Sequence, residues 1–157
     1  KMKNRPEYIL MIGDDMLPSW NSLILLYEEI VNRQYDVLAG LYYMKTDQYS
    51  MPLVVGAHNS IKGYLLPGTH FKVGEIMEVD LCGMDFTLIK TDFLERLGPP
   101  PWFESCNSKN MLNEKNDGIS LFTEDAFFCA KVKKAGGRIG INTNVRIGHM
   151  TKFGEVF

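Results

Sequence analysis

Two adjacent carboxylates follow an apolar run near the start of the sequence. Asp14 and Asp15 come directly after Tyr8–Ile12 and a single glycine, Gly13. Acids at the carboxyl end of a buried strand lie where open α/β sheets bind ligands, and oxygen ligands suit Mg²⁺ or Mn²⁺. Asp is also common in solvated turns. The pattern alone leaves a metal site and a solvated turn equally open.

A second acidic pair, Glu124 and Asp125, stands at the start of a predicted helix. Helical spacing puts Asp125 on the same face as Phe128 and Cys129, at the open end of the apolar stripe, with Glu124 about 100° away. The helix dipole favours the ionised form, so Asp125 is expected to be charged at pH 7 and suited to act as a base or an electrostatic stabiliser. The commoner alternative is that both acids only complement the dipole.

A histidine and an aromatic pair are further candidates. His149 follows a predicted strand and a glycine, where a neutral imidazole could bind a metal together with Asp15, although a lone His is more often simply hydrogen-bonded. Trp102 and Phe103 follow three prolines. They could line a substrate cleft or, as aromatic residues more often do, fill the core.

The elements that must position these residues follow from the apolar patterns. The run 8–12 lacks alternation, which predicts a strand covered on both faces, as in a parallel sheet. A helix is predicted to open at Pro18 and Ser19, and 36–44 reads as the second strand of a βαβ unit. The predicted buried stripe of that helix is Leu23, Leu26, Tyr27 and Ile30.

The rest of the chain continues this alternation of strands and helices. Strands are predicted at 53–57, 75–82, 84–89 and 138–147, helices at 92–98 (capped by Thr91 or Asp92) and 124–135 (capped by Thr123), and a polar loop at 104–120. We therefore expect an α/β fold and one domain over 1–157.

Composition excludes several classes of protein. The chain has 157 residues, 45% hydrophobic and 23% charged, with a net charge of −2. This balance argues against a polybasic nucleic-acid binder, and no apolar run reaches the roughly 20 residues of a membrane span. Three separated cysteines without a CxxC pair favour a reducing, cytoplasmic setting. The GxGxxG, P-loop and GxSxG motifs are absent from the sequence.

The ordered set of motifs resembles a known family. YILMIGDDM, VDLCGMDFTLIKTDFLERLG, PPWF and TEDAFFCAKVKKAGGRIGINTNVRIGH follow one another between residues 8 and 150. In this order they resemble the family 2-like glycosyltransferases with the GT-A fold. The resemblance implies a mixed sheet flanked by helices, a nucleotide-sugar donor, and a carbohydrate or another hydroxyl acceptor.

The resemblance also implies a donor-side site. Asp15 matches the last acid of the DxD motif, the usual ligand of Mn²⁺ or Mg²⁺. Asp14 matches the middle position, and His149 the late histidine that completes the metal site. Gly13 stands where the first Asp often stands, which removes one expected carboxylate.

On the acceptor side, the resemblance implies that Asp125 is the catalytic base of an inverting reaction, with Glu124 as its partner. It assigns Trp102, Phe103 and Gly83 to acceptor binding.

A second departure concerns the region before the acids. The family carries an N-terminal nucleobase-binding unit, whereas about a dozen residues precede Asp14 here. We therefore expect a fragment or a naturally shortened member, and an unpaired strand at 8–12 that favours association of two or more copies.

Two other functions compete with this one. The alternative is a non-catalytic GT-A domain that binds carbohydrate or a protein partner. The joint presence of Asp15, Asp125 and His149 argues against it. A nucleotidyltransferase is a third hypothesis, disfavoured because the Gly-rich N-terminal loop of that class is absent.

Overall fold

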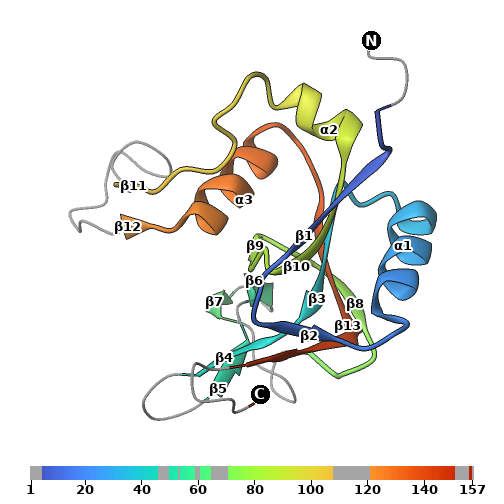
Figure 1. Ribbon diagram of the computed structural model, residues 1–157. Helices are drawn as coiled ribbons and strands as arrows, with labels where there is room; N and C mark the ends of the chain where they lie inside the picture. The colour runs from blue at the N-terminus through green and yellow to red at the C-terminus, as the bar shows by residue number, and fades with distance from the viewer. Residues whose placement is uncertain are drawn as a thin grey trace.

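The computed structural model describes residues 5–45, 50–52, 54–58, 61–64, 71–107, 121–150 and 156. A mixed six-stranded sheet with helices on both sides forms its centre (Figure 1). The elements in chain order are β1 (Tyr8–Ile12), β2 (Met16–Pro18), α1 (Ser22–Arg33), β3 (Val37–Leu41), β4 (Tyr43–Lys45), β5 (Ser50–Pro52), β6 (Val54–His58), β7 (Ile61–Tyr64), β8 (Ile76–Val79), β9 (Leu81–Cys82), β10 (Phe86–Lys90), α2 (Thr91–Arg96), β11 (Cys106–Asn107), β12 (Leu121–Phe122), α3 (Glu124–Lys134) and β13 (Ile139–His149).

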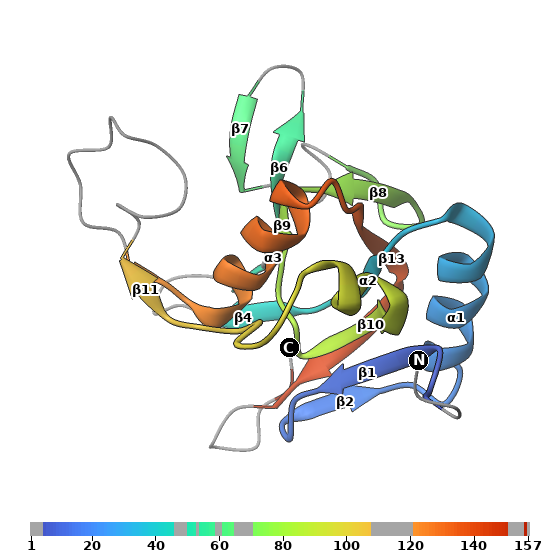
Figure 2. The ribbon, with the colours of Figure 1, turned by 90° about the horizontal axis from the view of Figure 1, so that it is seen from above.

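The main sheet has the order β1-β10-β3-β13-β2, and β8 pairs with the free side of β13. β13 is the strand that joins its parts: it runs parallel to β3 and antiparallel to both β8 and β2. Figure 2 shows the β6–β7 hairpin extending away from this sheet. The α/β class and the central mixed sheet flanked by helices agree with the sequence-based expectation at this coarse level.

The prediction that β1 is a fully covered parallel strand is wrong. β1 pairs antiparallel with β10, lies at the end of the strand order, and is only half-buried. β1 and β3 do run in the same direction around α1, but β10 lies between them. The run Tyr8–Ile12 lacks alternation, so the sequence pattern signalled burial but carried no information on strand direction.

Helix α1 begins later than predicted because the chain first forms β2. Met16–Pro18 pairs with the end of β13, and the helix then starts at Ser22. Its buried residues are Ser22, Leu26 and Ile30, whereas Leu23 and Tyr27 of the predicted stripe are 44% and 48% exposed. The inward face of α1 is therefore narrower than the apolar pattern suggested.

Alternate residues of β3 feed two separate cores. Leu38 packs in the cluster that contains Leu26 and Ile30 of α1. Val37, Ala39 and Leu41 pack in the cluster that contains five buried residues of α2 and α3, namely Phe93, Leu94, Phe128, Cys129 and Val132. This period-two division makes a three-layer arrangement with the sheet in the middle.

Other local predictions have mixed outcomes. Thr123 is the N-cap of α3, as predicted, although its side chain makes no capping hydrogen bond. α2 starts at Thr91, so its N-cap is Lys90 rather than Thr91 or Asp92. Within the predicted loop, Cys106–Asn107 pairs with Leu121–Phe122, and 108–120 lies outside the described residues. No helix in the described ranges is long and apolar enough to cross a membrane.

Candidate functional site

Strand pairing brings distant acids to one end of the sheet. Ile12 lies opposite Phe86 in the antiparallel β1–β10 ladder, so the next residue, Gly13, lies beside Asp85, and its N–H donates to the Asp85 carbonyl at 2.8 Å. His149 ends β13 opposite Met16, and the N–H of Met150 donates to the Asp15 carbonyl at 2.9 Å. The end of β1, the start of β10 and the end of β13 therefore meet.

Asp15 and His149 are in direct contact although 134 positions separate them. Nε2 of His149 lies 3.0 Å from Oδ2 of Asp15, which confirms the expected approach of these two side chains. Nδ1 of His149 lies 3.0 Å from the Tyr43 carbonyl. A carbonyl only accepts, so Nδ1 carries a proton and donates it. Nε2 then faces the carboxylate, where a proton or a cation must lie between them.

This geometry suits a divalent cation. Histidines that bind metals commonly donate their second ring N–H to a backbone carbonyl, as His149 does. The described residues contain no ready-made group of three or more His, Cys, Asp or Glu side chains. Mg²⁺ and its relatives are often held by one or two carboxylates and the substrate's phosphates. Asp15 and His149 fit such a partly open site.

Asp125 lies at the N-terminus of α3, half-buried, at the open end of the helix face formed by Phe128 and Cys129. Its Oδ2 accepts the N–H of Met84 at 3.3 Å. Burial raises the pKa of Asp125 to about 6; the Met84 hydrogen bond opposes this rise, and the charges of Asp85 and Glu124 add to it. The orientation agrees with the prediction. The helix dipole alone predicted a charged Asp125 and left out burial, which raises its pKa. With a pKa near 6 the carboxyl group is still mostly ionised at pH 7.

Asp125 opens onto a cleft of about 370 Å³. Its walls combine carboxylates with apolar side chains. The lining residues are Met11, Ile12, Gly13, Met84, Asp85, Phe103, Glu124 and Asp125. A molecule that enters this cleft meets both the carboxylates of Asp125 and Asp85 and the apolar end of β1.

The remaining predicted residues divide into those that line the cleft and those that do not. Phe103 lines it and stacks on Phe128 with ring centroids 4.4 Å apart. Glu124 is exposed at the rim of the cleft, where its Oε2 accepts a hydrogen bond from Ser105 Oγ at 3.4 Å. The helical spacing predicted that Glu124 faces away from Asp125, whereas both residues line the same cleft. Trp102 does not line the cleft; its Nε1–H donates to the Gly98 carbonyl at 2.8 Å and its ring packs on the core.

Asp14 and Gly83 have surroundings that differ from those of a ligand site. Asp14 is exposed in the turn between β1 and β2 and takes no part in the Asp15–His149 contact. Gly83 packs against the hydroxyl of Tyr42, in space that a Cβ would overlap, and it does not line the cleft. Acceptor binding by Gly83 stays a prediction, and its observed surroundings explain the glycine by close packing.

Sequence reasoning missed Asp85 and Tyr42. Tyr42 is 4% exposed, and burial together with the neighbouring Asp85 carboxylate raises the pKa of the phenol. Its ring meets His149 edge-on at 5.8 Å. A charged residue within the otherwise apolar predicted strand 84–89 was the available signal for Asp85. Only the antiparallel pairing of β1 with β10 brings Asp85 to the site, and the sequence does not reveal that pairing.

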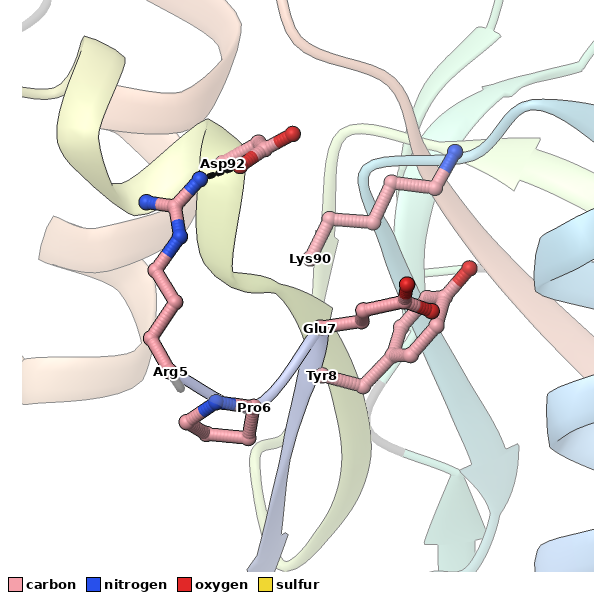
Figure 3. Close-up of a pocket in the computed structure, with 6 residues that line it drawn as sticks. All are labelled: Arg5, Pro6, Glu7, Tyr8, Lys90 and Asp92. Atoms are coloured by element: carbon pink, nitrogen blue, oxygen red, sulfur yellow. Dashed lines mark hydrogen bonds and ion pairs between the residues drawn. The ribbon is translucent and has the colours of Figure 1, made fainter. Parts of the chain in front are cut away.

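A larger cleft, of about 520 Å³, lies at the opposite end of the β1–β10 ladder (Figure 3). Tyr8 pairs with Lys90 there, four residues along β1 from Ile12, a separation of about 14 Å. Its lining is highly charged, but Arg5 forms ion pairs with Asp92 and Glu95. This cleft has the larger volume, but the smaller one contains half-buried carboxylates without a basic partner among the described residues. We therefore take the smaller cleft as the candidate functional site.

Comparison with known proteins relates the chain to a solved fold. No protein-family model matches the sequence. No curated protein matches it either. Among 22 chains of solved structure that are similar is the crystal structure of A197 from STIV, with a TM-score of 0.56 and 20% identity over 96% of this chain. The chain spans 65% of the length of that protein. At this identity the similarity is one of fold, a mixed α/β arrangement.

Proposed function

We propose that the chain is a metal-dependent glycosyltransferase with a GT-A-like fold, which moves a sugar from a nucleotide-sugar donor to an acceptor hydroxyl. The observation that carries the proposal is the contact between Asp15 and His149, just after the end of β1, where Ile12 and Gly13 line the cleft with Asp125. Asp125 opens onto a cleft that Gly13 also lines, two residues before Asp15, so these motifs lie near one another although they are far apart in the sequence.

The donor side rests on Asp15 and His149. A bound Mn²⁺ or Mg²⁺ would neutralise the charge that develops on the leaving diphosphate. His149 is oriented for this by the Tyr43 carbonyl, which fixes the tautomer with Nε2 free toward Asp15. Asp15 is 44% exposed, so it can reach donor phosphates that approach from solvent.

The acceptor side rests on Asp125. Its pKa of about 6 suits a general base at neutral pH, since the carboxylate is ionised yet retains appreciable basicity. The Met84 N–H holds one carboxylate oxygen and leaves the other for the proton of an acceptor hydroxyl. Phe103 offers that acceptor a flat apolar surface within the same cleft.

A non-catalytic domain that binds carbohydrate or a protein partner is the second candidate. The observation that favours it is again the Asp15–His149 contact, because the two side chains can satisfy each other through a proton alone. The two candidates differ in whether Asp125 turns over a substrate.

The test is transfer, or donor hydrolysis, measured across a panel of nucleotide sugars with Mn²⁺. Asp125→Asn should lower the rate by about 10²–10⁴-fold, the usual contribution of a positioned base. Glu124→Gln is the matched control and should have a much smaller effect because Glu124 is exposed at the rim. Turnover by Asp125→Asn at the wild-type rate would disprove the base assignment. A wild type that binds nucleotides or sugars without turnover would favour the non-catalytic domain.

A further inference from the structure

One helix covers the α1 side of the sheet and leaves the β1 end open. Among the described helices, α2 and α3 pack in the opposite core, so α1 lies alone on its side (Figure 1). α1 packs mainly on β3 and β13, which lie in the middle of the strand order. β1 ends that order and is only half-buried, whereas β3 is buried throughout. Part of an apolar strand therefore stays accessible beside the helix.

The outer face of α1 is apolar as well. Four of its side chains are 44–51% exposed, namely Leu23, Ile24, Tyr27 and Val31. Trp20, just before the helix, is 89% exposed. The Tyr8 ring of β1 meets the Tyr27 ring edge-on, with centroids 5.4 Å apart, so the helix face is continuous with β1. We call β1, Trp20 and these four helix residues the β1–α1 surface.

The area of this surface is large enough for a stable interface. From their exposures, the five side chains of Trp20 and α1 present roughly 600 Å², the upper end of the largest apolar patch on a typical monomer. Two copies joined through these side chains would bury roughly 1,200 Å², the lower bound for stable protein–protein interfaces. The accessible part of β1 adds to this area. A second copy of the chain therefore supplies enough surface to cover the patch.

The edge of β1 has the features of a strand that pairs. Among the described strands, β1 is hydrogen-bonded only to β10. Edge strands are usually protected from pairing with another chain by charged residues, Pro or a bulge. β1 has the sequence YILMI and forms a regular ladder with β10, so it has none of these protections. Its outward backbone groups can accept a second β1 in the antiparallel direction.

We propose that the β1–α1 surface is a homodimer interface, in which β1 of a second copy extends the sheet and the two α1 faces pack on each other. A single two-fold axis pairs a strand antiparallel with its own copy and also sets a helix face against itself. This inference goes beyond the proposed function and does not rest on it, because dimerisation is measured without turnover.

The experiment measures the molar mass of the full chain by light scattering, over a concentration series that reaches the high micromolar range. The wild type should approach twice the chain mass of 17.9 kDa. Ile24→Lys places a charge in the α1 face and should raise the dissociation constant about 10-fold or more. Circular dichroism checks the fold of each variant, and Val31→Lys replaces Ile24→Lys if that variant does not fold.

Val73→Lys is the matched control. Val73 is 41% exposed, and it precedes β8, which pairs with β13 on the side of the sheet away from β1. This variant adds the same charge at a similarly exposed apolar residue and should dimerise as the wild type does. A wild type that stays monomeric through the series would overturn the inference. Dimerisation of Ile24→Lys with the wild-type dissociation constant would overturn it as well, because the copies would then meet elsewhere.

Amide hydrogen exchange tests the part of the proposal that concerns β1. The β1 amides that point away from β10 should exchange about 10-fold or more slowly in the wild-type dimer than in monomeric Ile24→Lys. Equal exchange in the two samples would show that β1 does not pair across the interface and would overturn the inference. The proposed function would be unaffected by that result.

Discussion

The two ends of the β1–β10 ladder carry similar numbers of charged residues and differ in how those charges are compensated. At the Tyr8–Lys90 end, Arg5 pairs with Asp92 and Glu95, and these acids are 82% and 56% exposed. At the Ile12–Phe86 end, Asp85 and Asp125 are half-buried and, within the described residues, no Lys or Arg pairs with them. Exposed ion pairs of the first kind contribute little to the free energy of folding.

The contrast shows why the smaller cleft is the better functional candidate. Partial burial without a cationic partner costs free energy, and that cost is visible in the raised pKa of Asp125. Partly buried carboxylates without a cationic partner are typical of sites that bind a charged ligand or move a proton. The following predictions compare the two ends directly.

The largest expected effect comes from neutralising one acid at each end. Asp15→Asn should lower Mn²⁺-dependent turnover by about 100-fold or more, because it removes the carboxylate that faces Nε2 of His149. Asp92→Asn should leave turnover unchanged. Both are measured as kcat/KM for the donor at saturating acceptor. Equal losses from the two changes would mean that the two ends do not differ as described.

The packing beneath the site should be almost as sensitive. Gly83→Ala would drive a Cβ into the Tyr42 hydroxyl, and we expect it to lower the free energy of unfolding by about 3 kcal/mol. Gly13→Ala should cost clearly less, since its contacts are 3.2 Å or longer. Urea unfolding followed by tyrosine and tryptophan fluorescence measures both. Wild-type stability for Gly83→Ala would contradict the buried position of Tyr42.

The pH dependence of turnover should report Asp125. A base must be deprotonated, so with a pKa of about 6 the rate should fall about tenfold per pH unit below 6 and level off above it. The measurement is kcat/KM from pH 4.5 to 8. A profile that stays flat down to pH 5 would exclude Asp125 as the titrating base.

The smallest effect is on stability, and it has the opposite sign from most substitutions. The folded chain binds the Asp125 proton more tightly than the unfolded chain, whose pKa is about 3.9, so stability falls as pH rises from about 4 through 6. Asp125→Asn should therefore raise the free energy of unfolding on the order of 1 kcal/mol at pH 7.5 and make little difference at pH 4. A destabilised variant at pH 7.5 would show that the Met84 hydrogen bond outweighs burial.

Local patterns in the sequence were enough to predict part of the site. Periodicity alone placed Asp125 on the inward side of α3, because a helix fixes which residues share a face. Asp15 and His149 both follow predicted strands, and their family resemblance led us to expect the contact that the structure contains. Each of these inferences needed only one element at a time, or two motifs already linked by the resemblance.

The parts that could not be predicted depend on which strands pair. Asp85 lies beside Gly13 only because β10 runs antiparallel to β1, and the apolar run of β1 gives no direction. Tyr42 ends a buried stretch and looks like core until the Asp85 carboxylate is found beside its hydroxyl. Leu23 and Tyr27 looked buried for a related reason: the extent of the sheet beneath α1 is a property of the fold and not of the helix.

The most direct test of the central claim is the location of Mn²⁺ in crystals soaked with that ion and a nucleoside diphosphate. Anomalous scattering should give a peak between Oδ2 of Asp15 and Nε2 of His149, which now lie 3.0 Å apart and would separate to admit the ion. The account predicts this peak and none at the Arg5–Asp92 cleft. A peak at that other cleft, or no peak beside Asp15, would contradict it.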